Sequence, residues 1–263
     1  MIANGVADNE IRNPEAGWRG LYLVGAAAAF IAALVFRRFC SAELFLFGSL
    51  GVIDAPVVSP ANAQEWFALL QTQPVIGLIL LDVLDIINYV LVGLIYLALA
   101  GALRRVNIGA VIAAAAAGLV GVAVYLASNQ AFALLALSRQ YETAATEAQK
   151  ASFLAAGEAL LAMNHPGAPY IGAGFTLALF LVTVAGLIFA SLMWRSPAFG
   201  RAAAITGILA HSFMLALFVA LAFAPDWVAL PPSLSAVFLL AWYLLIGWRL
   251  FKLAAGRNSP DQA

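Results

Sequence analysis

Two aspartates lie close together in an otherwise apolar stretch, LLDVLDIINYVLVGLIY, at residues 80–96. Asp82 and Asp85 are three positions apart, which on a helix separates their side chains by about 5–6 Å. In poorly hydrated surroundings two carboxylates at that distance resist double ionisation, so one of them must be protonated or balanced by a donor or a cation. The pair is therefore the first candidate for a functional site.

A polar stripe runs along one face of the helix that this stretch predicts. At about 100° per residue, the two aspartates, Tyr89, Gly93 and Tyr96 fall within about 80° of arc. Ionisable groups in a membrane span are costly and usually face protein. The stripe therefore predicts a contact with a neighbouring helix rather than with lipid.

The next apolar segment carries residues that would meet the stripe at a similar height. A row of small residues at four-residue spacing allows close helix approach, and Tyr125 and Asn129 continue that row outward. The row consists of Ala113, Ala117 and Gly121. We predict a polar pocket between the two segments that opens toward the outer face, formed by Asp82, Asp85, Tyr89, Tyr125 and Asn129. The alternative is purely structural, since such groups also hydrogen-bond to one another or to backbone carbonyls and hold helices together.

His211 is a secondary candidate. It lies about 15 Å along a helix from Arg201, near mid-membrane, whereas Asp85 lies near the outer boundary, about 28 Å from Arg104. We therefore expect no direct contact between His211 and Asp85. Two interpretations of His211 stay open, a neutral packing residue and a proton relay or ligand contact. His165 is expected to be an ordinary residue of an outer loop.

Metal and catalytic signatures are missing from the sequence. Two histidines and the single cysteine, Cys40, supply no usual zinc-binding set. The sequence has no HEXXH, no GXSXG and no phosphate-binding glycine loop, and no nucleophile is evident beside the aspartates. We expect no metal, no cofactor and a protein that is not an enzyme.

The elements that carry these residues are predicted membrane spans. Of the 263 residues, 64% are hydrophobic and 10% are charged, whereas a soluble domain is about half apolar and about a quarter charged. With 13 basic and 13 acidic residues the chain has no net charge, which argues against a nucleic-acid partner. A membrane helix needs about 20 apolar residues. Six segments qualify, at about 18–36, 75–103, 108–137, 170–194, 201–223 and 233–250.

The predicted fold is therefore all-α, a polytopic membrane protein with a bundle of six transmembrane helices and short helical outer loops. With six spans, both ends of the chain and the turns after the second and fourth spans share one side. That side carries nine of the 13 basic residues, namely Arg12, Arg19, Arg104, Arg105, Arg195, Arg201, Arg249, Lys252 and Arg257. We therefore place the segment 1–17 and the tail 254–263 in the cytoplasm, on either side of a transmembrane domain at 18–253.

Two long segments, 39–74 and 138–169, fall on the outer side. Residues 44–53 are too few for a span and predict an interfacial piece, which leaves open whether 41–58 re-enters the membrane. The stretch ANAQEWFALLQTQ at 61–73 predicts an amphipathic helix on the outer surface. The second long segment predicts a helix over 139–163. Together the two segments could form a small outer cap.

Four stretches of the chain are similar to a known family. They are SLMWRSPAFGRAAAITGILAHSF, PPSLSAVFLLAWYLLIGWRLFKL, QTQPVIGLILLDVLD and IYLALAGALRRVN. They resemble the bacterial membrane-protein family called domain of unknown function 4386, most distinctively in the basic turn with Ser-Pro and Phe-Gly-Arg. The resemblance covers roughly 18–253 and implies a multi-helix protein of the bacterial inner membrane. It carries no known activity and no functional residues.

Three functions are compatible with these features. The first is a non-enzymatic protein that binds a lipid, a small amphiphile or a partner helix at the outer pocket. Its partners would be membrane lipids, such a ligand, another membrane protein or a second copy of the chain. The second is a small-solute or proton-coupled transporter, which needs a polar path from Asp85 through His211 to the cytoplasm. The third is an intramembrane enzyme that uses Asp82 or Asp85 as acid and base. We expect the first, because the inner halves of the second and third spans supply few polar residues.

Overall fold

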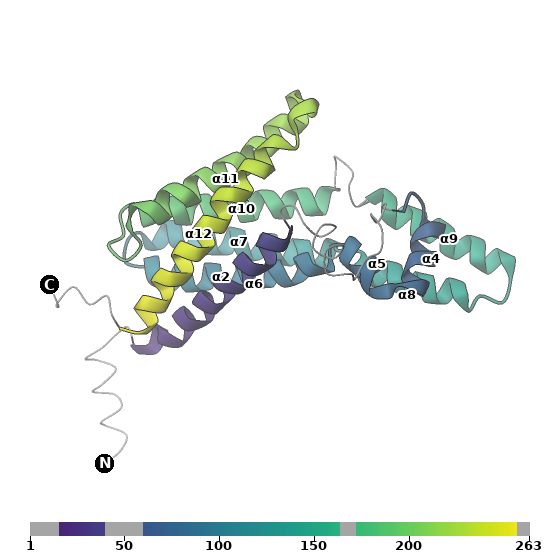
Figure 1. Ribbon diagram of the computed structural model, residues 1–263, viewed down its shortest axis with the longest axis horizontal. Helices are drawn as coiled ribbons and strands as arrows, with labels where there is room; N and C mark the ends of the chain where they lie inside the picture. The colour runs from purple at the N-terminus through teal and green to yellow at the C-terminus, as the bar shows by residue number, and fades with distance from the viewer. Residues whose placement is uncertain (1–15, 40–59, 164–171, 257–263) are drawn as a thin grey trace, which may run out of the picture.

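The computed structural model describes residues 16–39, 60–163 and 172–256 (Figure 1). These residues are helical, and no strand occurs among them. The elements are η1 (Ala16–Trp18), α2 (Arg19–Phe39), α4 (Ala63–Thr72), α5 (Pro74–Leu80), α6 (Val83–Leu103), α7 (Ile108–Ser128), α8 (Ala131–Glu142), α9 (Glu147–Met163), α10 (Ala173–Met193), α11 (Gly200–Phe223), η2 (Pro225–Trp227) and α12 (Leu230–Ala254). The segment 41–58, Cys40 and His165 lie outside the described residues, so the predictions made for them stay predictions.

Five stretches of helix are long and apolar enough to cross a membrane. They are Val83–Leu103, Ile108–Glu142, Ala173–Met193, Gly200–Phe223 and Pro225–Ala254. In α2 the apolar stretch that qualifies, Arg19–Leu34, is shorter than a span. The prediction of an all-helical, multi-span membrane protein is therefore confirmed, and the sixth span stays a prediction.

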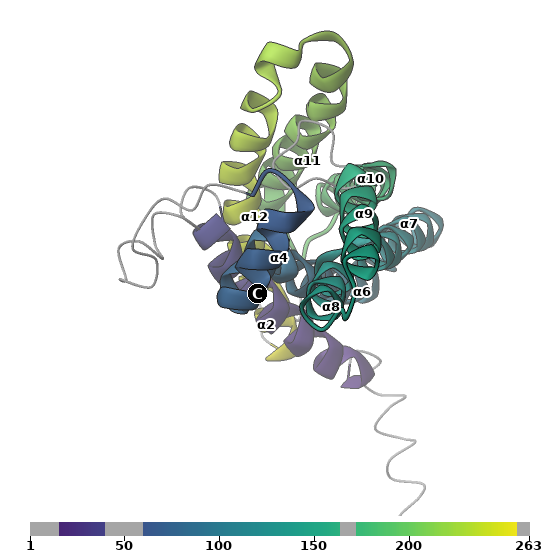
Figure 2. The ribbon, with the colours of Figure 1, turned by 90° about the vertical axis from the view of Figure 1, so that its right-hand side faces the viewer.

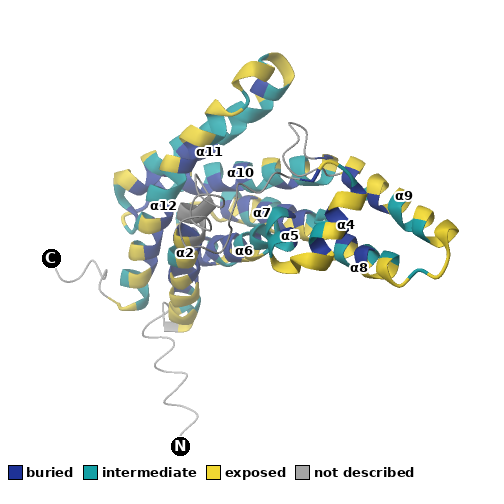
Figure 3. Ribbon diagram, turned by 45° about the vertical axis from the view of Figure 1, so that its right-hand side comes forward, coloured by how far each residue is buried: buried dark blue, intermediate teal, exposed yellow. Residues whose placement is uncertain are grey.

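Six helices pack into a ring that forms most of the molecule in Figure 1. The order around the ring is α2, α6, α7, α10, α11 and α12, and α12 packs back against α2. α6 and α10 also touch across the ring. The core between them is aromatic and aliphatic, with Tyr96, Phe189 and Trp242 fully buried. In Figure 3 the buried residues, in dark blue, recur along the ribbons of the ring helices.

Small residues let the helices approach closely, but not always in the predicted pairs. Gly118 of α7 lies against the ring of Tyr96 of α6, where a Cβ would come within 2.3 Å of the ring. The sequence predicts that the small-residue row ending at Gly121 faces the second span. In the structure Gly121 faces α10, and its Cβ would lie 2.9 Å from the carbonyl oxygen of Ala178. That part of the prediction is wrong, because α7 uses this face to pack on α10.

The predicted second and third spans are both interrupted near the end farther from the basic turns, which is the end predicted to face outward. The stretch 75–103 divides into α5 and α6, with Leu81 and Asp82 between them. The stretch 108–137 ends as α7 at Ser128 and resumes as α8 at Ala131. α6, α7 and α10 each have 21 residues, about 31 Å of helix, which matches the hydrocarbon core of a bilayer. The interruptions therefore lie at the outer edge of the apolar layer.

The helices α4, α5, α8 and α9 form a cap beyond these interruptions, seen end-on in Figure 2. Trp66 and Phe67 are completely buried in its core. The amide of Ala63 donates to Glu158 Oε1 at 2.7 Å, and this bond ties the start of α4 to α9. The predicted amphipathic helix is thus present, but α8 and α9 cover its apolar face.

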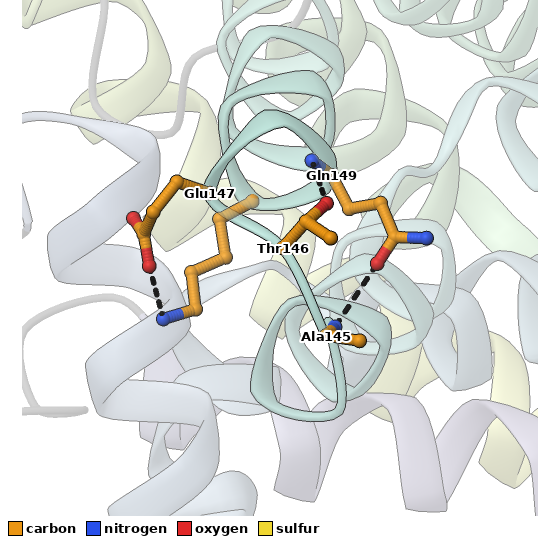
Figure 4. A network of polar contacts seen from close by, with 5 residues as sticks. Ala145, Thr146, Glu147 and Gln149 are labelled. Carbon is orange, nitrogen blue, oxygen red and sulfur yellow. Dashed lines mark hydrogen bonds and ion pairs between the residues drawn. The ribbon is translucent and has the colours of Figure 1, made fainter.

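The predicted helix over 139–163 is broken at residues 143–146. Two reciprocal bonds begin α9, in which the Gln149 amide donates to Thr146 Oγ1 at 3.2 Å and the Ala145 amide donates to Gln149 Oε1 at 3.0 Å (Figure 4). The Thr-x-x-Gln spacing of a capping box is visible in the sequence, but the Gln149 side chain accepts from the amide of Ala145 instead of that of Thr146. The single-helix prediction is wrong because it overlooks that start signal.

The described charges separate between the two ends of the ring. The end with the α6–α7 and α10–α11 turns carries Arg19, Arg104, Arg105, Arg195, Arg201, Arg249 and Lys252. All described acidic residues, together with Arg37, Arg38, Arg139 and Lys150, belong to the opposite half. The first and last ring helices meet at the basic end, since a Cβ on Gly256 would lie 3.2 Å from Arg19 Nη2.

Candidate functional site

The candidate site begins at the interruption between α5 and α6. Asp82 has a φ of 59°, and no other described residue except glycine has a positive φ. This left-handed conformation is costly for most side chains and is tolerated best by glycine, asparagine and aspartate. It turns the chain between the two helices. The strain is therefore concentrated on the residue that also carries the carboxylate.

The second interruption, between α7 and α8, lies directly beside the first. Asn129 Nδ2 donates to the carbonyl oxygens of Leu81 and Asp82 at 3.5 Å each, while its Oδ1 accepts from the amide of Ala131 at 3.0 Å. Tyr125 Oη also donates to the carbonyl oxygen of Asp82, at 3.3 Å. Backbone groups freed from a membrane helix need such partners. Asn129 therefore provides hydrogen-bond partners at both interruptions. Its bonds at the interruption between α5 and α6 are long and correspondingly weak.

Aromatic rings fill the interface below the interruptions. Tyr89 of α6 stacks on Tyr125 of α7 with ring centroids 3.8 Å apart and planes 2° apart. Phe175 of α10 meets Tyr125 edge-on at 5.5 Å. The two tyrosines are 6% and 2% exposed, so their rings occupy the space between α6 and α7 instead of lining a gap. The polar groups gather at the outer edge of this stack.

Asp82 and Asp85 differ in their surroundings. The Asp82 carboxylate is partly buried and makes no hydrogen bond or ion pair with the described residues, and it lies one residue outside the span Val83–Leu103. Its burial raises its pKa from the usual 3.8 to about 6. The sequence predicts mutual repulsion of the two acids as the cause, whereas loss of hydration is the cause in the structure. Asp85 lies one turn deeper and interacts electrostatically with Tyr89, Tyr125 and Tyr243.

Tyr243 of α12 is the site residue that the sequence did not suggest. It is buried, and it interacts electrostatically with Asp85 of the polar stripe from α12, the helix on the other side of α2. A lone tyrosine in the apolar stretch AWYLLIG gives no spacing signal. Only the packing of α2 between α6 and α12 brings the two helices near one another.

The polar stripe extends inward as far as Tyr96. Its hydroxyl donates to the carbonyl oxygen of Val182 at 2.7 Å, which uses its hydrogen. Further inward on α6 the buried side chains are Ala98, Leu99 and Leu103, all of them apolar. At the inner end of the helix, Arg104 donates to Tyr22 Oη at 3.0 Å and lies 4.5 Å from the Trp18 ring.

His211 belongs to a separate place in the ring. Its ring lies against Gly186 of α10, where a Cβ would come within 2.2 Å, and meets Trp242 edge-on at 5.0 Å. It is 6% exposed, and neither His211 Nε2 nor Trp242 Nε1 has a hydrogen-bond partner among the residues that the structure describes. None of its contacts is with Asp82 or Asp85. This agrees with the packing interpretation of His211.

The described residues hold no group of three or more His, Cys, Asp and Glu side chains that could bind a metal. What the site offers is one unpaired carboxylate, a second carboxylate one turn away, and three phenols. Such groups can accept a hydrogen bond, bind a cation or take up a proton.

Comparison of the chain with protein-family models, with curated proteins and with solved structures found no match. The resemblance to domain of unknown function 4386 therefore stays a prediction.

Proposed function

We propose that this chain is a six-helix protein of the bacterial inner membrane that binds a lipid or another small amphiphile at its outer end. The binding site is the edge of the α6–α7 interface beneath the cap, formed by Asp82, Asp85, Tyr89, Tyr125 and Asn129. One observation carries the proposal. The Asp82 carboxylate is partly buried without a partner among the described residues, at a strained break in a membrane helix.

The sixth span in this proposal is α2. It has 21 residues, about 31 Å of helix, and packs between α6 and α12 as a full member of the ring. Six spans place both ends of the chain at the basic end of the ring, which the distribution of arginine and lysine assigns to the cytoplasm. The acidic half with the cap then faces outward.

The polar stripe of α6 ends inside the apolar layer, and this favours binding over transport. From Val83 to Tyr96 the stripe covers 13 residue steps, about 20 Å of helix. The Tyr96 hydroxyl is already bonded to backbone, and leucines follow it. His211 makes no contact with the stripe, so it does not extend it. A site open at one end suits a bound ligand better than a solute that must leave on the other side.

Native mass spectrometry of protein released from mild detergent tests the proposal. The wild-type protein is expected to retain an amphiphile from the membrane, and Asp82→Asn is expected to lose most of it. Asp226→Asn is the matched control, because Asp226 is an exposed acid at the tip between α11 and α12. Equal retention by all three proteins would show that Asp82 has a structural role only.

A further inference from the structure

The basic end of the ring carries positive charge that no described acid balances. Every described acidic residue lies in the other half. At the α6–α7 turn part of this charge is used within the protein, because Arg104 donates to Tyr22 Oη at 3.0 Å and lies against the Trp18 ring. The rest of the charge gathers where the α10–α11 turn meets the end of α12.

Arg249 of α12 reaches across to the start of α11. Gly200, the first residue of α11, has a φ of 73°, and a Cβ on it would lie 3.3 Å from Arg249 Nη2. The partly buried guanidinium therefore rests on the α10–α11 turn. Arg195 in that turn and Arg201 beside Gly200 are both exposed. Three arginines, from α12, α11 and the turn, thus lie at one corner of the basic end.

A tryptophan and a lysine mark the level of the membrane surface at this corner. Trp248 directly precedes Arg249 on α12 and is 50% exposed. The Lys252 Nζ, one turn further along the helix, lies 5.1 Å from the centroid of the Trp248 ring. Tryptophan collects at the headgroup level of a bilayer, and lysine near a helix end extends its ammonium to the same level. Arg249 and Lys252 therefore lie where lipid phosphates lie.

An apolar row leads from Trp248 into the hydrocarbon layer on the same face of α12. Leu244, one turn before Trp248, is 48% exposed, and Val237, two turns before Leu244, is 67% exposed. Lys252 ends this row at the basic end, because residues 244, 248 and 252 recur every four positions and so share a face. A phosphate bound at Arg249 and Lys252 would have its acyl chains beside exposed apolar side chains.

We infer that this corner binds the headgroup of an anionic phospholipid in the leaflet at the basic end. Arg249 and Lys252 hold the phosphate, and the acyl chains lie along Trp248, Leu244 and Val237. A guanidinium can present two parallel N–H groups to phosphate oxygens, and each basic residue near the membrane surface adds to the attraction for anionic lipid. A zwitterionic headgroup would bring its own ammonium among these cations, so a headgroup with net negative charge is preferred. The site is independent of the proposed one, which lies at the other end of the ring.

Native mass spectrometry of the full chain, delipidated in mild detergent, tests the inference by titration with single lipids. The probes are dioleoylphosphatidylglycerol and dioleoylphosphatidylcholine, which have the same acyl chains. Wild type is expected to bind phosphatidylglycerol about tenfold more tightly than phosphatidylcholine. Arg249→Gln and Lys252→Gln should each weaken binding of phosphatidylglycerol about fivefold and leave binding of phosphatidylcholine unchanged. Lys252→Gln decides the test if Arg249→Gln fails to fold, because Lys252 lies over an exposed ring.

Arg105→Gln is the matched control, because it removes one exposed positive charge from the same end at the α6–α7 turn. In the ring, α2 lies between α6 and α12. Since salt screens charges over about 10 Å, this variant should weaken binding of phosphatidylglycerol by less than about twofold. A loss in Arg105→Gln as large as that in Arg249→Gln would mean that the basic residues attract lipid only as a general field, and would overturn the site.

Three further outcomes would overturn the inference. Equal binding of the two lipids by wild type would show that the charge of the headgroup does not matter. Displacement of phosphatidylglycerol by an equal concentration of glycerol 3-phosphate would show that the ligand is a soluble phosphate. Asp82→Asn is expected to bind phosphatidylglycerol as wild type does. Loss of binding in Asp82→Asn, with Arg249→Gln unaffected, would place the lipid at the outer end, which supports the proposed function and contradicts the site at Arg249.

Discussion

The outer end of the ring and its middle both hold polar side chains that lack partners in the described structure, yet they are built differently. At the outer end, two helices are interrupted side by side and Asp82 adopts a left-handed conformation. In the middle, His211 and Trp242 lie between unbroken helices and against Gly186 and Gly207. The outer group is an acid at the edge of the apolar layer. The middle group is a pair of rings in a tightly packed core.

This difference shows that a buried polar atom without a partner is not sufficient evidence for a site. The flat ring of His211 packs onto Gly186, and this packing leaves one ring nitrogen without a hydrogen bond, which is destabilising. Asp82 adds strain and a carboxylate without a partner among the described residues. Features that destabilise the fold in several ways at once are better explained by function.

The middle region should therefore respond to changes of volume. Gly186→Ala places a Cβ within 2.2 Å of the His211 ring, so the ring or α10 must shift. We expect unfolding to become easier by about 3 kcal/mol, measured by thermal unfolding in detergent. Gly20→Ala is the control, because nothing lies within 4 Å of its Cβ on α2. If the two variants are equally stable, His211 is not held by close packing, and the contrast between the regions fails.

The outer region should respond to pH. Asp82 binds its proton more tightly in the folded protein than in the unfolded chain, so the native state loses stability as pH rises from about 4 to about 6. The loss is about 1–2 kcal/mol after allowance for partial exposure. Asp82→Asn should remove it and be more stable than wild type above pH 6. Thermal unfolding of both proteins across this range measures the effect, and parallel curves would show that Asp82 is not responsible.

Much of the fold could be predicted because apolar length and basic turns are properties of the sequence itself. The ends of α6 and α7 at Leu103 and Ile108 follow from the arginines between them, and the cap follows from two long polar-flanked segments. The two interruptions could not be predicted from hydropathy, because LILLDVLDII is apolar on both sides of Asp82. The break depends on a backbone conformation that aspartate tolerates but does not require.

The candidate site could be predicted from the sequence where its residues follow helical periodicity. The stripe from Asp82 to Tyr96 faces protein, and Tyr125 and Asn129 meet it as the spacing predicts. The stacked tyrosines and the approach of Tyr243 depend on how neighbouring helices rotate, which no single helix encodes. The contact between Asn129 and the Asp82 backbone could not be predicted either, because it requires the break between α5 and α6 to lie beside the break between α7 and α8.

The weakest predicted effect concerns Asn129 itself, and a residue at the opposite end of α7 provides its match. Asn107 Oδ1 accepts from the Ala110 amide at 3.1 Å, just as Asn129 Oδ1 accepts from Ala131 at 3.0 Å. Asn107→Ala should reduce stability by about 1 kcal/mol, because α7 loses its N-cap bond. Asn129→Ala should have a similar effect of about 1 kcal/mol, because the Ala131 amide at the start of α8 loses its acceptor. The additional bonds of Asn129 are 3.5 Å long and should add less than about 0.5 kcal/mol. Of these two variants, Asn129→Ala alone should weaken amphiphile binding, because Asn129 bonds to the Asp82 carbonyl oxygen and Asn107 lies at the other end of α7. A stability loss in Asn129→Ala well beyond that of Asn107→Ala, with binding intact, would mean that the two breaks exist to join the helices and not to hold a ligand.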